Sequence, residues 1–596
     1  MWFTCFFLSI GCLFLAAVFS LTFNKSELAK KRKFTAFHSL FAGIFFSAVF
    51  MFVPTHLVTA ELSALGYIRA FLLSVFNTMQ VFYFGCDFAN VANSMIYCPE
   101  WLNITYQVWI SFIFVVAPVF SFGFVLSLFK NASANLKYFG SYFKDVYVFS
   151  ELNDKSLTLA SDIKSKHKNA VIVFTDVFES NEESIYELTD RAKKLGAICF
   201  KKDILVMNFR NHSESRAIYL FAIGNNETEN LNQSLKLIEN YRNRSNTHIY
   251  VFSTKIESEL LLTAIDKGRI KVRRISEVQS LVNRILYERG SIIFENAKEI
   301  PDGNKKISAV VVGMGRHGTE LVKALSWFGQ MDGYKLEINA FDKDPLAEEK
   351  FIALAPELMS PDYNGVEIEG EAQYKITIHP NVDVATVTFI NEISKINDAT
   401  YVIVALGNDD VNINAAVNLR MYFERLGIHP VIQAIVYNPQ QKKALDGIKN
   451  YRGQEYDIEF IGDMESSYTE DVIIDSELEY DALQRHLKWG KEEDFWTYEY
   501  NYRSSVASAI HLKARIRCGI PGSDKKEEAL TDEERNIIEV LEHRRWNAYM
   551  RSEGYVFSGS KEKTSRNDLA KMHHDLVDFS SLTEEDKRKD SKVGTS

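Results

Sequence analysis

Three long stretches without a charged side chain lie in the first part of this sequence and limit what it can fold into. Residues 1–23, 35–60 and 104–129 contain no Asp, Glu, Lys or Arg. A helix of about 20 apolar residues crosses the ~30 Å hydrocarbon core of a bilayer, so each stretch is long enough to span one. The sequence therefore predicts a multi-pass transmembrane domain at residues 1–130, in contact with membrane lipid.

Basic side chains predict the orientation of this domain. They follow the first stretch and the last: Lys25, Lys30, Lys31, Arg32, Lys33, Lys130, Lys137 and Lys144. Because positive charge is retained on the cytoplasmic side, we expect Met1 outside and the C-terminal domains in the cytoplasm. The first stretch has no basic segment before it, which argues against a cleaved signal peptide. We expect a protein of the cell (inner or plasma) membrane.

The segment at residues 62–97 is also mostly apolar and aromatic. One full crossing here would put the C-terminal domains outside, and two crossings need about 40 residues plus a turn. The remaining solution is a re-entrant, pore-like helix and loop, because non-helical backbone at membrane depth has to be buried in protein or line water. An ordinary span that breaks the charge rule is the alternative.

The same segment resembles the pore of potassium-type channels, in which a pore helix ends in a T-V-G-Y-G-D filter. The matching residues are Thr78, Val81, Tyr83, Gly85 and Asp87. The resemblance implies a pore for an inorganic cation in a homo-oligomer, which in that family is a tetramer. Phe82 and Phe84 stand where a filter needs the backbone freedom of glycine, so potassium selectivity is in doubt.

Charge and cysteine usage exclude several classes of function. The net charge of −10 argues against nucleic acid as a partner, since such binding favours a basic surface. The six cysteines are scattered with no C-x-x-C pair, which excludes the common zinc and haem-attachment spacings. We therefore expect no metal site, and a reducing compartment for the C-terminal part.

A glycine-rich turn carries the clearest motif of the C-terminal part. An apolar strand at residues 307–312 leads into Gly313, Gly315 and Gly318, in G-x-G-x-x-G spacing, and then into a helix at residues 319–328. A second strand, at residues 335–341, ends in Asp342. This order is typical of a Rossmann fold, in which the glycines let a pyrophosphate approach the helix and the acid binds a ribose.

This motif predicts NAD or another adenine nucleotide as a cofactor. Arg316 and His317 stand at the expected start of the helix, where they would add positive charge towards phosphate. Their alternative role is that of a solvated helix N-terminus. The loop itself can also persist as structure only, without a bound nucleotide.

An earlier part of the chain repeats this pattern without the glycines. Strands at residues 146–150 and 170–174 flank a turn, residues 150–155, that contains no glycine, so we expect this copy to be structural. Both copies continue with an apolar strand, a Gly-Asn turn and an Asn-rich helix start, at residues 217–232 and 399–414. The repeat predicts two Rossmann-like domains, at residues 145–295 and 305–475.

Tandem Rossmann units behind membrane helices resemble the RCK (regulator of K⁺ conductance, or TrkA-N) domains of ligand-gated channels. Such domains form cytoplasmic rings whose ligand-driven rearrangement acts on a pore. The resemblance covers residues 145–475 and assigns nucleotide binding to Gly313, Gly315, Gly318 and Asp342.

The last hundred residues carry a different signature. Glu542, His543 and Trp546 form an E-H-x-x-W pattern, followed by Gly554-Tyr555, the segment HHDLVDF at residues 573–579 and a charged end. This resembles the RyR domain, the repeat named for ryanodine receptors and also found in bacterial chains, over residues 500–596. His574 and Asp578 stand where the family pattern has proline. The resemblance implies a small, mainly α-helical sensor of a nucleotide-derived ligand.

The side chains of this segment suit such a ligand. An aromatic face beside guanidinium groups can stack on a base and pair with phosphate. The predicted ligand-binding residues are Glu542, His543, Arg545, Trp546, Arg551 and Tyr555. The alternative is that His543 and Trp546 are core residues and the charges lie on a solvated helix.

These features together predict an α-helical membrane domain, two α/β Rossmann-like domains and a small α-helical domain. We expect a ligand-gated ion channel or a membrane-permeabilising effector, with potassium transport as one such activity. The alternatives are a non-conducting membrane-anchored nucleotide sensor and an NAD(P)-dependent membrane enzyme. No catalytic motif surrounds His379, His429 or His486, so we expect no enzyme and assign no catalytic residue.

Overall fold

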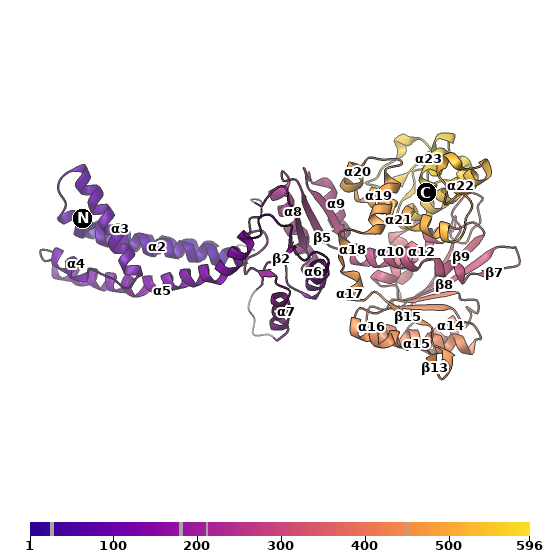
Figure 1. Cartoon of the computed structure of the whole chain (residues 1–596), viewed down its shortest axis with the longest axis horizontal. Helices are drawn as coiled ribbons and strands as arrows, with labels where there is room; N and C mark the ends of the chain where they lie inside the picture. Colours follow the sequence, from indigo (N-terminus) through magenta and orange to yellow (C-terminus); the bar gives the residue numbers. More distant parts are fainter. Residues whose placement is uncertain (24–28, 178–182, 210–211, 449, 596) are drawn as a thin grey trace. The chain divides into compact units, whose positions relative to one another are not determined.

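Apolar helices come first along the chain and parallel sheets follow (Figure 1). The computed structural model describes residues 1–23, 29–177, 183–209, 212–448 and 450–595. They form two units. The helical unit consists of Met1–Phe143, Val173–Tyr186 and Gly196–Ser213. The larger unit consists of Lys144–Ile172, Glu187–Leu195 and Glu214–Ser596.

In the described part of the chain, five helices precede the first strand. They are α1 (Trp2–Phe23), α2 (Ala29–Val58), α3 (Ala64–Phe82), α4 (Phe88–Ser94) and α5 (Glu100–Phe139). Among the described residues, four segments are long and apolar enough to cross a membrane: Trp2–Ser20, Ser39–Val58, Ala64–Phe82 and Glu100–Ser121. The predicted association with a membrane is supported by this length and composition. Lys25 lies outside the described residues, as do the side chains of the basic run at 30–33 and of Lys130.

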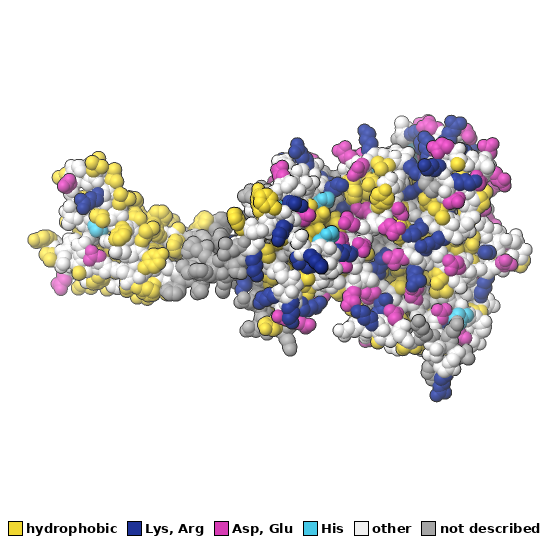
Figure 2. Space-filling model, in the orientation of Figure 1, with side chains coloured by type: hydrophobic (Ala, Val, Ile, Leu, Met, Phe, Trp, Pro, Cys, Tyr) yellow, Lys and Arg dark blue, Asp and Glu magenta, His cyan; other side chains and the backbone are white. Residues whose placement is uncertain are grey.

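Among the helices α1 to α5, some polar groups pair in the interior while many apolar side chains are exposed. The Tyr106 hydroxyl donates to the Met51 carbonyl at 2.8 Å, and Trp109 Nε1 donates to Ser9 Oγ at 2.9 Å. Hydrophobic side chains form patches on the face of these helices that Figure 2 shows, and Phe14 is 66% exposed. Polar groups paired between helices and an apolar outer surface are what a lipid environment demands.

The segment predicted to be re-entrant is helical for most of its length. Thr78 and Val81 are buried within α3, where the Thr78 hydroxyl donates to the Ser74 carbonyl at 2.8 Å. Only the turn at residues 83–87, with Tyr83 82% exposed, separates α3 from α4. No glycine or proline interrupts residues 67–82, so the backbone satisfies its own hydrogen bonds as a helix.

This arrangement corrects the predicted filter. A filter directs successive backbone carbonyls at an ion, but the Val81 carbonyl accepts the Phe84 amide and the Gln80 carbonyl accepts the Gly85 amide. Gly85 and Asp87 belong to the turn, with Asp87 at the position before α4. The five predicted pore residues therefore do not form an extended filter.

The first sheet has the strand order β3-β2-β1-β4-β5-β6. Its strands are β1 (Val146–Phe149), β2 (Val171–Phe174), β3 (Ile198–Cys199), β4 (Ile218–Ala222), β5 (Thr247–Phe252) and β6 (Lys271–Ile275). Pairing is parallel between β1 and β4, β4 and β5, and β5 and β6. The connecting helices are α6 (Asp154–Lys166), α7 (Glu183–Lys194), α8 (Glu227–Tyr241) and α9 (Ile256–Ala264).

The second sheet repeats this topology, with the order β10-β9-β8-β11-β12-β15. Its strands are β8 (Lys305–Val312), β9 (Tyr334–Phe341), β10 (Lys375–His379), β11 (Tyr401–Val404), β12 (Val431–Ile435) and β15 (Ile458–Ile461), and β7 (Lys298–Glu299) pairs antiparallel with β8. Its helices include α12 (Arg316–Phe328), α13 (Ala347–Leu354), α14 (Val387–Ile393), α15 (Asp409–Arg425) and α16 (Pro439–Asp446). Counted within each copy, both orders read 3-2-1-4-5-6, which confirms the two Rossmann-like folds.

The C-terminal part is mainly helical. It comprises α19 (Glu477–His486), α20 (Glu492–Thr497), α21 (Glu499–Arg517), α22 (Asp532–Ser552), α23 (Glu584–Gly594) and the two-stranded pair β16 (Val556–Phe557) and β17 (Met572–His573). Short helices α17 (Met464–Ser467) and α18 (Glu470–Ile473) lead into it.

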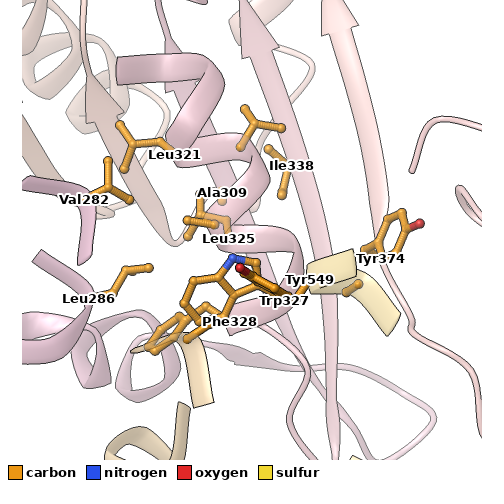
Figure 3. Close-up of a cluster of buried hydrophobic side chains, with 14 of the residues drawn as sticks. Val282, Leu286, Ala309, Leu321, Leu325, Trp327, Phe328, Ile338, Tyr374 and Tyr549 are labelled. Carbon is orange, nitrogen blue, oxygen red and sulfur yellow. The ribbon is translucent and has the colours of Figure 1, made fainter. Parts of the chain in front are cut away.

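One hydrophobic core joins these helices to the second sheet (Figure 3). Tyr549 of α22 packs edge-on against Trp327 of α12, with ring centroids 6.3 Å apart. Val282 and Leu286 of α10 (Glu277–Arg289) belong to the same core, although the sequence assigns α10 to the first domain. The second Rossmann-like fold and the C-terminal helices therefore fold around shared apolar residues.

Candidate functional site

A cavity of about 490 Å³ lies among the C-terminal helices. Four predicted ligand-binding residues, Glu542, His543, Arg545 and Trp546, line it. All four lie on α22, at spacings of three and four residues that bring side chains to the same side of a helix. A capping box of Thr531 and Glu534 starts this helix, as the acidic first turn in the sequence predicts.

Two guanidinium groups contact a single carboxylate at the edge of this cavity, and a third guanidinium group lines the cavity as well. Glu542 Oε1 accepts hydrogen bonds from Arg545 Nε at 3.0 Å and from Arg545 Nη2 at 2.7 Å, and Arg515 Nη2 lies 3.5 Å from Glu542 Oε2. Arg485, at the C-terminal end of α19, lines the same cavity. All of these side chains are buried: Arg485, Arg515, Arg545 and Glu542 are at most 4% exposed. We call these four residues the arginine cluster.

The arginine cluster carries an excess of buried positive charge. Burial lowers the pKa of Arg485 and of Arg515 to about 10, against the opposing charge of Glu542. Burial would raise the pKa of Glu542, but Arg545 and Arg515 outweigh it and hold that pKa at about 2. Within the cluster three guanidinium groups therefore outnumber the one carboxylate, in a medium that penalises unpaired charge.

Several N–H groups of the cluster remain without an acceptor. Within the described residues, no hydrogen-bond partner contacts Arg545 Nη1, Arg485 Nε or Arg485 Nη2. Backbone carbonyls at the end of α23 supply two acceptors to the cluster. The Gly594 carbonyl accepts from Arg515 Nη2 at 2.8 Å, and the Thr595 carbonyl accepts from Arg485. Carbonyl dipoles offset part of the charge, and an anion in the cavity would offset more.

Aromatic side chains complete this part of the cavity. Trp546 is half-buried, lines the cavity and packs edge-on against His573, with centroids 4.8 Å apart. Tyr500 and Trp489 line it as well. Trp546 therefore lines the cavity and also packs against the shared core, so both interpretations describe part of its surroundings. Flat apolar surface beside guanidinium groups suits the stacking of a nucleobase.

The opposite part of the cavity is acidic and rich in histidine. His573, His574, Asp575, Asp586 and Asp590 line it. Burial disfavours protonation of His543, but Asp590, 3.4 Å away, outweighs burial and raises the pKa of His543. From the sequence, the HHDLVDF segment at residues 573–579 was predicted only to belong to the RyR-like pattern, not to line a site. The consecutive His573, His574 and Asp575 were the signal that could have singled it out.

Two predicted ligand-binding residues lie elsewhere. Arg551 is fully buried, donates to Glu371 Oε2 at 3.1 Å and to Glu357 Oε2 at 3.2 Å, and its guanidinium carbon lies 3.7 Å from the ring centroid of Tyr363. Tyr555 is 6% exposed and packs in the shared core. Both predictions are corrected: Arg551 anchors α22 to the second Rossmann-like fold, because the carboxylates there already pair with its charge.

The glycine-rich turn forms the geometry that the sequence predicts. Gly313 has φ 98°, and a Cβ there would lie 2.7 Å from the Ala405 carbonyl oxygen. A Cβ on Gly318 would lie 1.6 Å from the Gly313 carbonyl oxygen, whereas a Cβ on Gly315 would meet no atom within 4 Å. The outer glycines are thus required by close packing, and the middle one leaves open space at the start of α12.

Asp342 stands beside this turn. Its Oδ2 accepts the Met314 amide at 2.5 Å and its Oδ1 accepts the Asp344 amide at 2.7 Å. A carboxylate offers about four lone-pair sites, so two remain for the hydroxyls of a ribose. The open position at Gly315, the helix N-terminus and Asp342 together fit an adenine nucleotide.

Arg316 and His317 line a second cavity, of about 350 Å³, between the two Rossmann-like folds. The Arg316 side chain is 75% exposed, with Nη1 3.7 Å from Glu227. His317 Nε2 lies 2.9 Å from the Tyr437 hydroxyl, and burial lowers the pKa of His317. Arg316 remains available to an anion, whereas neutral His317 does not supply the positive charge that the sequence analysis assigned to it.

No protein-family model matches this sequence, and no match was found among curated proteins. The similarity to RCK and RyR domains consequently depends on the quoted motifs. The parallel sheets establish Rossmann-like folds, and the apolar helices support a membrane protein.

Proposed function

We propose that this chain is a membrane receptor in which a small nucleotide-type anion binds the C-terminal cavity and changes the permeability of the membrane to ions. This makes it a ligand-gated ion channel or a membrane-permeabilising effector. The observation that carries the proposal is the arginine cluster, in which Arg515 and Arg545 pair with one carboxylate and the buried guanidinium group of Arg485 lines the same cavity.

The chemistry of the cavity supports an organic phosphate as the ligand. Arg485 and Arg545 offer N–H groups that lack acceptors among the described residues. One guanidinium group can donate two parallel hydrogen bonds to two oxygens of a phosphate. Trp546 and Tyr500 offer stacking surface for a base. The volume, about 490 Å³, is within the usual range of about 300–1,000 Å³ for small-molecule sites.

A signal from this cavity has a physical route to the second Rossmann-like fold. Trp546 and Arg545 lie on α22, and the same helix carries Arg551 on Glu371 and Tyr549 on Trp327. A ligand that moves α22 thereby acts on α12, whose N-terminus follows the glycine-rich turn. Such a shift requires that the ligand bind one conformation more tightly than the other.

The membrane activity in this proposal does not depend on a potassium-type filter, since α3 is helical through Phe82. The tandem Rossmann-like folds support a relation to the RCK domains and, with it, a homotetramer. The glycine-rich turn is the proposed second ligand site, for NAD or another adenine nucleotide. The apolar helices support a place in the cell membrane, and the basic side chains that follow them in the sequence support a cytoplasmic location for the sheets.

Ion flux tests the proposal. The full chain, purified and reconstituted in liposomes, is assayed with ATP, ADP, NAD and ADP-ribose added one at a time. We expect at least one of them to change the flux at least tenfold. The Arg545→Lys variant, which keeps the charge but loses the paired contact with Glu542, should lose most of the response.

The matched control is Arg535→Ala, an arginine of the same helix that pairs with Glu527 away from the cavity. It should respond as the original chain does. Nucleotide binding without any flux would favour the non-conducting sensor, and equal responses of both variants would remove the arginine cluster as the ligand site.

A further inference from the structure

We propose that a third cavity, on one face of the first sheet, binds a small organic cation that carries a primary ammonium group. The cavity has a volume of about 530 Å³. Side chains of β4, β5 and β6 form its floor, and α19, α20 and the segment that leads into α19 form the opposite wall. The lining residues that carry the argument are Tyr219, His248, Tyr250, Arg273, Asp475 and Glu479. None of them lines the other two cavities.

The cavity lies apart from the place where such a sheet binds nucleotides. Parallel α/β sheets bind them beyond the carboxyl ends of the strands. Tyr219 and His248 are the second residues of β4 and β5, and Lys271 is the first residue of β6, so the floor includes the amino ends of these strands. The site is therefore independent of the glycine-free turn at residues 150–155 and of the proposed function.

The strongest observation is a buried hydroxyl without a partner. Tyr250 is 5% exposed and lines the cavity, and its ring stacks on Phe221 with centroids 5.0 Å apart. Within the described residues, no hydrogen-bond partner contacts the Tyr250 hydroxyl. Buried tyrosine hydroxyls usually find a partner, so a ligand in the cavity is expected to supply one.

The matching positions of the second fold satisfy one another. Tyr250 stands opposite Arg273 of β6, the last strand of the first sheet. Gln433 takes the same place in the second sheet, opposite Glu459 of β15. Gln433 accepts the Tyr401 hydroxyl at 2.6 Å and donates to Glu459 at 2.6 Å. The second fold thus closes this network, whereas the first fold directs a free hydroxyl at a cavity.

The charges around the cavity favour a cation. Arg273 pairs with Glu479, and Lys271 Nζ lies 3.9 Å from Glu492 Oε1. Asp475 is exposed on the wall and forms no ion pair with any described residue. Each cation of the lining therefore has a carboxylate, and one carboxylate remains without a counter-ion.

The polar groups of the cavity are acceptors that complement an ammonium group. Burial, and then the charge of Asp475, raises the pKa of Tyr219 to about 12. Burial and nearby Glu479 raise the pKa of Tyr250 well above 10, and burial lowers the pKa of His248 to about 4. All three side chains are thus neutral at pH 7. A primary ammonium donates three hydrogen bonds, and a carboxylate, a phenol oxygen and a neutral imidazole can each accept one.

Calorimetry with putrescine tests the site, using the full chain in detergent with no nucleotide present. Putrescine carries two primary ammonium groups, and we expect one molecule to bind per chain. Tyr250→Phe and Asp475→Asn should each weaken binding at least tenfold, because the first removes an acceptor and the second removes the counter-ion. The N-permethylated diamine keeps both charges but has no N–H group, and it should also bind at least tenfold more weakly.

Asp446→Asn is the control, since it removes another exposed carboxylate, one that pairs with Lys442 on α16. It should bind putrescine as the original chain does. Melting curves show whether each variant is folded, and the exposed Asp475 keeps the test valid if Tyr250→Phe is unstable. Absence of putrescine binding, equal binding by the original chain and Asp475→Asn, or equal binding of the permethylated diamine would overturn the site.

Discussion

The two Rossmann-like folds share a strand order but differ in the turn after their first strand. In the first fold the turn is filled by its own side chains: Asn153 and Ser156 cap α6 reciprocally, and Asn153 Nδ2 donates to the Ile223 carbonyl at 2.8 Å. In the second fold the turn contains Gly313 and Gly315, which have no side chains, and the space beside Gly315 is open. In two folds of the same topology, the side chains of a single turn therefore decide whether a phosphate can approach the backbone at the start of the helix.

The largest expected effect comes from packing at the open turn. Gly318→Ala should destabilise the chain by more than about 3 kcal/mol, because its Cβ would lie 1.6 Å from the Gly313 carbonyl oxygen. Gly224→Ala in the first fold should cost about 1 kcal/mol, since its Cβ meets the ends of the Glu151 and Asn230 side chains at 2.8 Å and 3.0 Å. Thermal unfolding of the full chain measures both. Equal losses would show that the two turns are equally tight.

A second change separates binding from packing. Gly315→Val fits an extended backbone (φ −67°, ψ −166°) with no close neighbour, so the chain should remain folded. Binding of NAD, followed as protection of residues 313–318 from hydrogen exchange, should fall at least tenfold, because the branched side chain covers the approach to the helix.

Asn153→Ala is its counterpart in the first fold. It should cost about 1 kcal/mol through loss of the helix cap and leave that protection unchanged. Loss of NAD binding in this variant, or none in Gly315→Val, would contradict the assignment of the two turns.

The third prediction concerns what the two folds share. In the first fold, Asn230 Oδ1 accepts the Gly224 amide at 2.7 Å, and Asn230 Nδ2 donates to the Phe252 carbonyl at 2.9 Å. In the second fold, Asn412 Oδ1 accepts the Leu406 amide at 2.7 Å, and Asn412 Nδ2 donates to the Ile435 carbonyl at 2.8 Å. Asn230→Ala and Asn412→Ala should each destabilise by about 1–3 kcal/mol, because buried backbone groups lose partners. Urea unfolding tests this. An effect in only one fold would mean that the repeated asparagines are not equivalent.

The smallest expected effect is one of pH. Burial, aided by Lys271, lowers the pKa of His248 on β5 to about 4, from 6.5 for a free histidine. The folded state thus holds its proton less tightly than the unfolded state, so the stability that His248 contributes is present above pH 6.5 and is lost as the pH falls towards 4. The corresponding strand of the second fold, β12, begins with Val431 and Ile432 instead.

Hydrogen exchange at pH 7 and pH 4.5 measures this difference. Acid should reduce the protection of β5 more than that of β12. The His248→Phe variant should remove most of the difference, because its ring keeps the stack on Tyr219 without titrating. An unchanged difference would assign the pH dependence to other groups.

The strands and the repeat were predictable because their signals are local. A parallel strand that is covered on both faces is an apolar run, as in residues 309–312, and a Gly-Asn turn precedes the same helix in both folds. The helical structure of the segment predicted to be re-entrant also follows from local signals. Its letters resemble a filter, but nothing between residues 67 and 82 breaks a helix, and local hydrogen bonds decided the outcome.

The sequence by itself determined the apolar helices, the two nucleotide-type folds and the open turn at Gly315, since each follows from residues that are close along the chain. Only the tertiary structure decided which charges act together. Arg515 and Arg545 come from two helices and meet at Glu542, and Arg485 of a third helix lines the same cavity. Arg551, six residues beyond Arg545 on α22, pairs with Glu371 instead. The reason is physical: the free energy of a buried charge depends on neighbours brought in by packing, and those neighbours lie far away in the sequence.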